Sequence, residues 1–247
     1  MSGQQPIERD LSILRWGGLA GMAGGVLFLA VFVLVGVFVG ADPAGPAAPI
    51  ERFPEIQLLR VLENGLYLAV LALWVPSYLA LGRALGPMRP ASAQFGGVLG
   101  IVALGILAAG ALPHTATVPL SDAYHDPTAT AAARDALVVA WQTTQGIFDA
   151  LLYTGLAIMP ASLILLGIAM LGSPAFGRRY GAASLVLGLV AAGSSVWVLL
   201  DPQSALAVFG VFALIVFHLA TGARLFALSI SSAQRSPTLV SAEGAGS

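Results

Sequence analysis

Apolar residues fall along this chain in long runs of about 20 residues or more, separated by short polar or proline-rich segments. An apolar helix of about 20 residues spans the hydrocarbon of a bilayer. The pattern therefore predicts an all-α, polytopic bundle of six transmembrane helices, built as one domain over residues 17–228 within the lipid bilayer. The expected spans are about 17–40, 58–81, 95–114, 147–171, 180–200 and 205–227.

The distribution of arginine predicts the orientation, because basic residues near the ends of spans stay in the cytoplasm. Most of the 11 arginines precede the first span, follow the sixth, or lie between spans two and three and spans four and five. The opposite side holds Arg52, Arg60 and Arg134 beside a larger number of acids. Both termini are thus expected to be cytoplasmic, with a short N-terminal segment at 1–16. Residues 229–247 are small and polar, which predicts a disordered cytoplasmic tail.

Composition narrows the classes of function. The chain is 57% hydrophobic and 9% charged, against about 25% charged residues in soluble domains. It has no cysteine, which excludes disulfides, iron–sulfur clusters and thiolate metal sites. Its net charge of −1 and lack of a basic run argue against nucleic acid as a partner. Since it also has no metalloprotease motif and no glycine-rich phosphate loop, we expect no enzymatic activity, no cofactor and no metal.

An unbroken helix that contains the fourth span would be longer than a bilayer is thick. Asp126-Pro127 predicts a helix N-cap followed by a first-turn proline. A helix from there to Leu171 would be about 67 Å long, twice the thickness of a bilayer. Either it projects outward as an amphipathic extension over residues 128–145, or it breaks near Gly146 or Pro160.

The first span carries Gly17, Gly21 and Gly25 at four-residue spacing. Small residues at this spacing let another helix backbone approach closely. The spacing itself allows either a helix of the same chain or a second subunit as the partner, and we favour the same chain.

Two acids lie inside the apolar runs, where insertion of a charge costs at least about 2.5 to 3.5 kcal/mol. Glu63 shares one helical stripe with Arg60, Asn64 and Tyr67, and Asp149 shares another with Gln142, Gln145 and Tyr153. His114 closes the third span on the same side, so the three helices are expected to converge on a polar pocket that opens outward. The candidate ligand or ion site consists of Glu63, Asn64, Tyr67, His114, Gln145, Asp149 and Tyr153.

These residues support two interpretations. In one, the acids accept a cation, a proton or a small polar ligand, and the protein is a small transporter or a binding protein for a cation or polar ligand. In the other, the polar groups only bond across helices. An alternative function is a non-enzymatic accessory or sensor subunit that docks an unknown membrane protein partner. His218 lies in the middle of the sixth span with no histidine at its depth to share a haem, and it is expected to be neutral and bonded to a neighbouring helix.

Three motifs carry a resemblance to a known group of proteins. They are Arg60-Val-Leu-Glu63 running to Leu81-Gly-Arg83, Gly146-Ile-Phe-Asp149-Ala-Leu, and Phe176-Gly-Arg-Arg-Tyr-Gly181. These are similar to motifs of a family of bacterial six-span membrane proteins catalogued as a domain of unknown function. The resemblance implies the same fold over nearly the whole chain and a place in a bacterial inner membrane, and it implies no activity. Where that family has a basic hairpin containing tryptophan before the fifth span, this chain has Arg178-Arg179-Tyr180.

Overall fold

The structure is a computed structural model that describes residues 4–41, 43–86, 91–201 and 204–243. Within these residues the chain is helical and contains no strand. The helices are α1 (Gln4–Val33), which continues into the π-helical segment η1 (Leu34–Val39), α2 (Ala48–Ala84), α3 (Ala91–Thr115), α4 (Thr117–His125), α5 (Ala131–Leu171), α6 (Gly177–Leu200) and α7 (Ala207–Glu243).

Six segments of the described chain are long and apolar enough to cross a membrane. They are Leu11–Val39, Ala48–Ala84, Ala91–His125, Ala131–Leu171, Gly177–Leu200 and Val208–Ser231. Each overlaps one of the spans expected from the sequence, so the prediction of an all-α chain with six helices of spanning length is confirmed. This length and composition are those of a multi-pass membrane protein.

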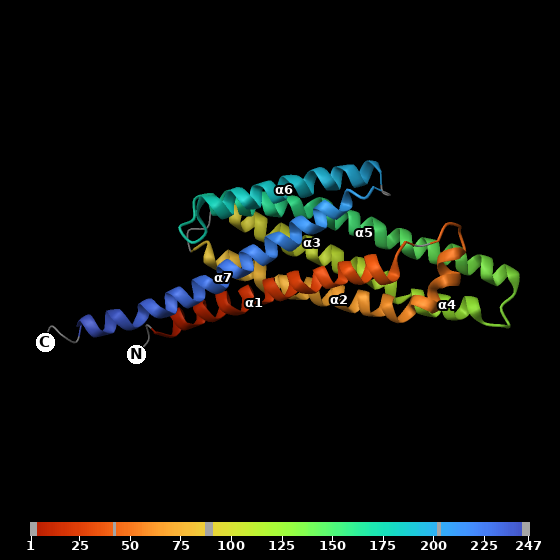
Figure 1. Ribbon diagram of the computed structural model, residues 1–247, viewed down its shortest axis with the longest axis horizontal. Coiled ribbons are helices and arrows are strands. Elements are labelled where there is room, and N and C mark those ends of the chain that lie inside the picture. Colours follow the sequence, from red (N-terminus) through yellow and green to blue (C-terminus); the bar gives the residue numbers. More distant parts are fainter. Residues whose placement is uncertain (1–3, 42, 87–90, 202–203, 244–247) are drawn as a thin grey trace.

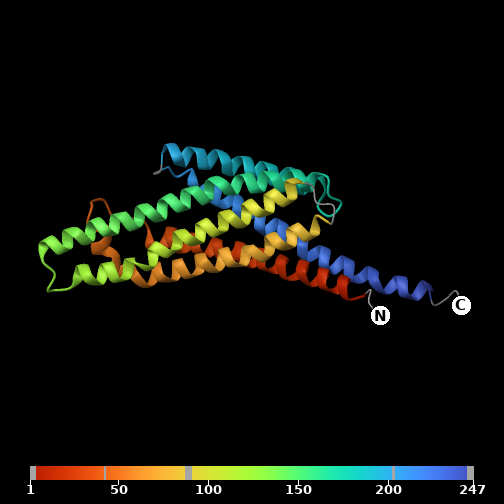
Figure 2. The same cartoon turned by 180° about the vertical axis from the view of Figure 1, so that it is seen from behind.

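The helices pack in a closed order. α1 packs on α2 and α7, α2 on α3, α3 on α5, α5 on α6, and α6 on α7. α1 begins and α7 ends at the same end of the bundle, and α4 lies at the other end (Figures 1 and 2). The main core fills the interior between these helices, and Trp74, Tyr78, Met159 and Phe217 are among its fully buried side chains.

The glycines of α1 pack within the chain. A side chain on Gly17 or Gly21 would collide with α2 at Ala80 or Ser77, and one on Gly25 would collide with Leu219 of α7. α1 therefore lies close to two other helices of the same molecule, as favoured from the glycine spacing.

α5 has 41 residues, which gives a length of about 62 Å. The helix does not break at Gly146 or Pro160, so the first of the two alternatives is correct and α5 projects beyond the bundle. There it packs with α4, which also packs on α2, and its Trp141 ring meets Phe53 in the first turns of α2 (Figure 1). A second hydrophobic cluster of Ile50, Phe53 and Trp141 holds this helical extension together.

The start of α5 differs from the sequence prediction. Thr130 is the N-cap, and its hydroxyl oxygen accepts a hydrogen bond from the Ala133 amide at 3.2 Å. Asp126 instead closes a turn, in which its carboxylate accepts bonds from the Thr128 amide at 2.7 Å and the Thr128 hydroxyl at 2.6 Å. These bonds hold the pKa of Asp126 below its ordinary value. The Asp126-Pro127 cap is therefore wrong, because the local Asp–Thr turn takes the aspartate before the helix begins.

The C-terminal segment also differs from its prediction. α7 continues as one helix to Glu243, through most of the segment whose composition predicts disorder. Residues 244–247 lie outside the described chain.

Candidate functional site

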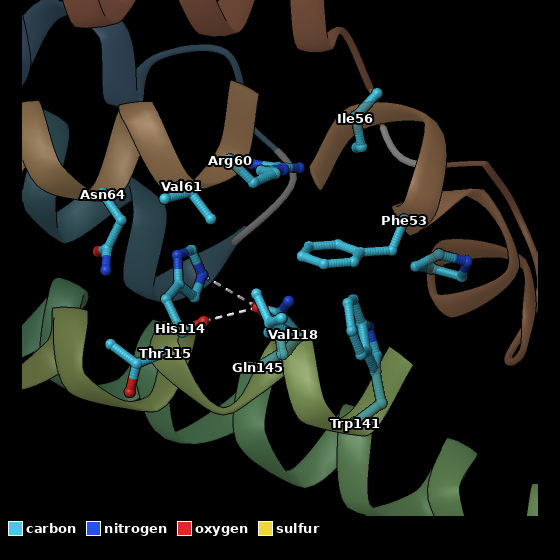
Figure 3. Close-up of a pocket in the computed structure, with 12 residues that line it drawn as sticks. Phe53, Ile56, Arg60, Val61, Asn64, His114, Thr115, Val118, Trp141 and Gln145 are labelled. Carbon is cyan, nitrogen blue, oxygen red and sulfur yellow. Dashed lines mark hydrogen bonds between the residues drawn. The ribbon is translucent and has the colours of Figure 1, made fainter. Parts of the chain in front are cut away.

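Two adjacent cavities lie where the helical extension meets the bundle. The first, here called the polar cavity, has a volume of about 210 Å³ and lies among α2, α3, α4 and α5 (Figure 3). Phe53, Ile56, Val118 and Trp141 contribute apolar walls. Its polar lining consists of Arg60, Asn64, His114, Thr115, Thr117 and Gln145.

Local structure explains how these side chains reach one space. Ile56, Arg60 and Asn64 follow each other at four-residue spacing and share a face of α2. His114 lies at the end of α3, just before the chain turns into α4, and the Thr117 hydroxyl donates to the His114 carbonyl oxygen at 2.6 Å. This bond ties the two helices together and fixes the position from which the imidazole enters the cavity.

The His114 ring is held from α5. Its Nε2 lies 3.3 Å from Oε1 of Gln145 (Figure 3). The ring also stacks on Phe148 at a centroid distance of 4.0 Å. From the other side, the Asn64 amide donates to the Ala111 carbonyl oxygen at 3.4 Å. Asn64 and His114 are thus positioned by contacts between helices that lie far apart in the sequence.

The second space, here called the aromatic cavity, has a volume of about 250 Å³. It shares Asn64 and His114 with the polar cavity, so these two side chains form the partition between the two spaces. Glu63 is its charged residue, and its apolar lining consists of Phe28, Val31, Phe32, Val35, Tyr67, Phe148, Leu152 and Val211.

An ion pair joins a residue of the polar cavity to a residue of the aromatic cavity. Nη1 of Arg60, which lines the polar cavity, lies 3.1 Å from Oε2 of Glu63, which lines the aromatic cavity. The exposed fractions of these side chains are 20% and 16%. The pair supplies one positive and one negative charge on successive turns of α2 at the partition.

The structure therefore brings together five of the residues expected at the site. Glu63, Asn64, Tyr67 and His114 line the aromatic cavity, and Gln145 joins Asn64 and His114 around the polar cavity.

Asp149 and Tyr153 lie elsewhere. Asp149 is exposed and lines an open depression beside the loop before α2, which adjoins the polar cavity at Trp141 and Gln145. Tyr153 lines a narrow space near α6 and α7. Along this part of α5 the face toward the aromatic cavity carries Phe148 and Leu152, which turns Asp149 away. The two acids expected to share one pocket thus line different spaces.

Several lining residues had no place in the sequence prediction. Trp141 lies four residues before Gln145 on α5, and this spacing was a signal that could have identified it. Phe28 and Phe32 had no such signal, because an apolar residue within an apolar run looks the same whether it faces lipid, core or cavity.

A separate aromatic cluster surrounds His218 deep in the bundle. The His218 ring stacks on Trp74 at 3.9 Å with an interplanar angle of 8°, and the edges of Tyr78 and Phe217 approach it at 5.3 Å. Among the described residues, neither His218 ring nitrogen has a hydrogen-bond partner. The expected hydrogen bond from His218 to a neighbouring helix is thus replaced by aromatic stacking.

Comparisons with protein families, with curated proteins and with solved structures find no match to this chain. The resemblance to a bacterial six-span family therefore stays a prediction.

Proposed function

We propose that this protein binds a small polar or cationic ligand at the two cavities and acts as a small transporter or ligand-binding protein of a bacterial inner membrane. The observation that supports this most directly is the convergence of Asn64, His114 and Gln145 on the polar cavity. These residues come from α2, α3 and α5, and they border a cavity with room for about seven water molecules of ~30 Å³ each.

The alternative that these groups only bond across helices explains less. Polar residues that serve only to join two helices fill the contact between them. Here the Asn64 and His114 side chains do bond to neighbouring helices, but each also faces two cavities. A few polar groups converging on a largely apolar space are typical of small-molecule sites.

The position of the two cavities along α2 supports a binding site near the membrane surface. A span of about 20 residues counted along α2 from Arg83 ends at Glu63, which places the partition near the boundary of the hydrocarbon. If the termini are cytoplasmic, as the arginines predict, this boundary is the outer one and the polar cavity is open to the periplasm.

The accessory-subunit alternative finds no support in the glycines of α1. Their spacing allowed a second subunit as partner, but α2 and α7 of the same chain cover Gly17, Gly21 and Gly25. Ligand binding is therefore the function that the described residues favour.

The proposal is tested by ligand-induced stabilisation of the purified full chain. A panel of small amines, amino acids and organic acids is screened for a rise in unfolding temperature, since a ligand at 100 times its Kd stabilises by about 2.7 kcal/mol. Asn64→Leu alters the wall shared by both cavities and should abolish the shift of any ligand found. Glu55→Gln is the control and should keep the shift, because Glu55 is an exposed residue of α2 outside both cavities. A panel without a single shift, or shifts that survive Asn64→Leu, would contradict the proposal.

A further inference from the structure

We propose that the ligand of the aromatic cavity is an organic cation that carries apolar groups, held by the carboxylate of Glu63 and by the surrounding aromatic rings. This inference rests on the proposed function and names the ligand class of the same site.

The charge of the cavity is the first argument. Among the described residues that line it, Glu63 is the one carboxylate, and most of its neighbours are aromatic or aliphatic. Arg60 supplies one positive charge to this carboxylate from the side of the polar cavity. A ligand cation in the aromatic cavity would approach the same carboxylate from the other side while its apolar groups contact the walls.

The aromatic rings are the second argument. Phe28, Phe32, Tyr67 and Phe148 all line the cavity, and the rings of Phe28 and Tyr67 meet at 49° with centroids 6.1 Å apart. These two rings are tilted toward each other and form a corner of the wall. Aromatic faces carry partial negative charge and attract cations, most strongly where water is excluded.

The lining of the aromatic cavity has too few oxygen atoms to suit a bare metal ion. Calcium takes six to eight oxygen ligands, and magnesium requires an octahedral shell of oxygens or waters. The lining supplies the carboxylate of Glu63 and few other oxygens among many carbon atoms. An ammonium group with apolar substituents matches this surface better than a strongly hydrated ion.

Arg60 gives the proposal a directional test. Its guanidinium lines the polar cavity and lies 3.1 Å from the Glu63 carboxylate, so it opposes a cation bound on the other side of that carboxylate. Removal of this positive charge should strengthen the binding of a cation, and removal of the negative charge should weaken it. An anionic ligand would show the opposite response to both changes.

Three probes of similar size separate the ligand classes: benzyltrimethylammonium as cation, benzyl alcohol as neutral molecule and benzylsulfonate as anion. Binding of each to the full chain in detergent is measured by titration calorimetry. We expect the cation to bind about tenfold more tightly than benzyl alcohol, a difference of about 1.4 kcal/mol.

The variants should then move the affinities in opposite directions. Glu63→Gln should weaken benzyltrimethylammonium by about tenfold or more, and Arg60→Gln should strengthen it, with benzyl alcohol changed less than about twofold. Glu55→Gln is the matched control, because Glu55 is an exposed acid of α2 outside both cavities. Phe148→Leu removes a ring but keeps an apolar wall, so it should weaken the cation selectively even if a charge variant fails to fold.

Two results would overturn the inference. In the first, benzylsulfonate binds more tightly than the cation, and Arg60→Gln weakens the binding of benzylsulfonate. The cavity would then be a site for anions. In the second, the unaltered chain shows no preference for the cation over benzyl alcohol. Neither result decides the proposed function, which depends on the Asn64→Leu response to the broader panel.

Discussion

Gly18 and Gly222 show at the scale of single residues how closely α1 and α7 approach. A Cβ atom on Gly18 would lie 2.7 Å from the carbonyl oxygen of Gly222, and one on Gly222 would lie 2.8 Å from that of Gly18. Both obstacles are backbone atoms, which cannot rotate away as a side chain can. The contact between these helices therefore depends on the absence of a methyl group at each position.

Gly18→Ala should therefore lower the free energy of unfolding by about 1 to 3 kcal/mol, the usual cost of overpacking. Gly97→Ala in α3 is the matched control, because beyond its chain neighbours and its own helix backbone no atom lies within 4 Å of its Cβ position. There alanine should be neutral or stabilise by up to about 1 kcal/mol through its higher helix propensity. Unfolding in mixed detergent micelles compares the two, and equal effects at both positions would contradict the packing described.

At the scale of elements, the distinctive feature is the extension built by α4 and the first turns of α2 and α5. Its small core centres on Phe53 and Trp141, whose rings meet edge to face at 5.1 Å. Both side chains also line the polar cavity, so the extension forms the wall of the site on the side away from the bundle.

Phe53→Ala should loosen this extension and leave the spanning helices intact. Removal of a buried phenylalanine costs about 3 to 5 kcal/mol, and here the loss falls on a small cluster separate from the main core. Hydrogen exchange in Thr117–His125 should rise strongly, with little change in the inner halves of α2 and α5. Leu58→Ala is the control, since Leu58 is 70% exposed on the same helix. A uniform rise in exchange over the whole chain would show that the two clusters are not separate.

At the scale of the whole molecule, the even number of spans places the start of α1 and the end of α7 at one end (Figure 1). Arg83, Arg178 and Arg179 lie at the helix ends on that side, so the basic-residue rule predicts that this end faces the cytoplasm. On that prediction, the extension and both cavities lie on the outer side of the membrane.

Cysteine labelling tests this topology without background, because the chain has no cysteine. Thr128→Cys, in the exposed turn between α4 and α5, should react with a membrane-impermeant maleimide in intact spheroplasts. Gly172→Cys, in the exposed turn between α5 and α6, should react only after permeabilisation. The reverse pattern would invert the molecule and place the cavities on the cytoplasmic side.

The individual residues of the site show how far the sequence can predict it. Glu63, Asn64 and His114 could be identified because polar groups in apolar helices are rare and costly. Asp149 satisfied the same rule and yet faces a different space, because the rotation of α5 about its axis is set by packing on α3 and α6. Phe28 and Phe148 line the aromatic cavity with no mark in the sequence that separates them from other core rings.

The number of apolar helices of spanning length and the helical class of the fold follow from the sequence alone, since each depends on one segment and its transfer from water to hydrocarbon. The starts of α2 at Ala48 and α5 at Ala131 lie well before the expected spans, because both helices continue into the extension. The order in which the helices pack, the two cavities and the partition made by Asn64 and His114 depend on contacts between residues far apart in the chain. Local apolar pattern carries no information about such contacts. Only the tertiary structure therefore decides which polar residues face one another and which ring completes the cavity wall.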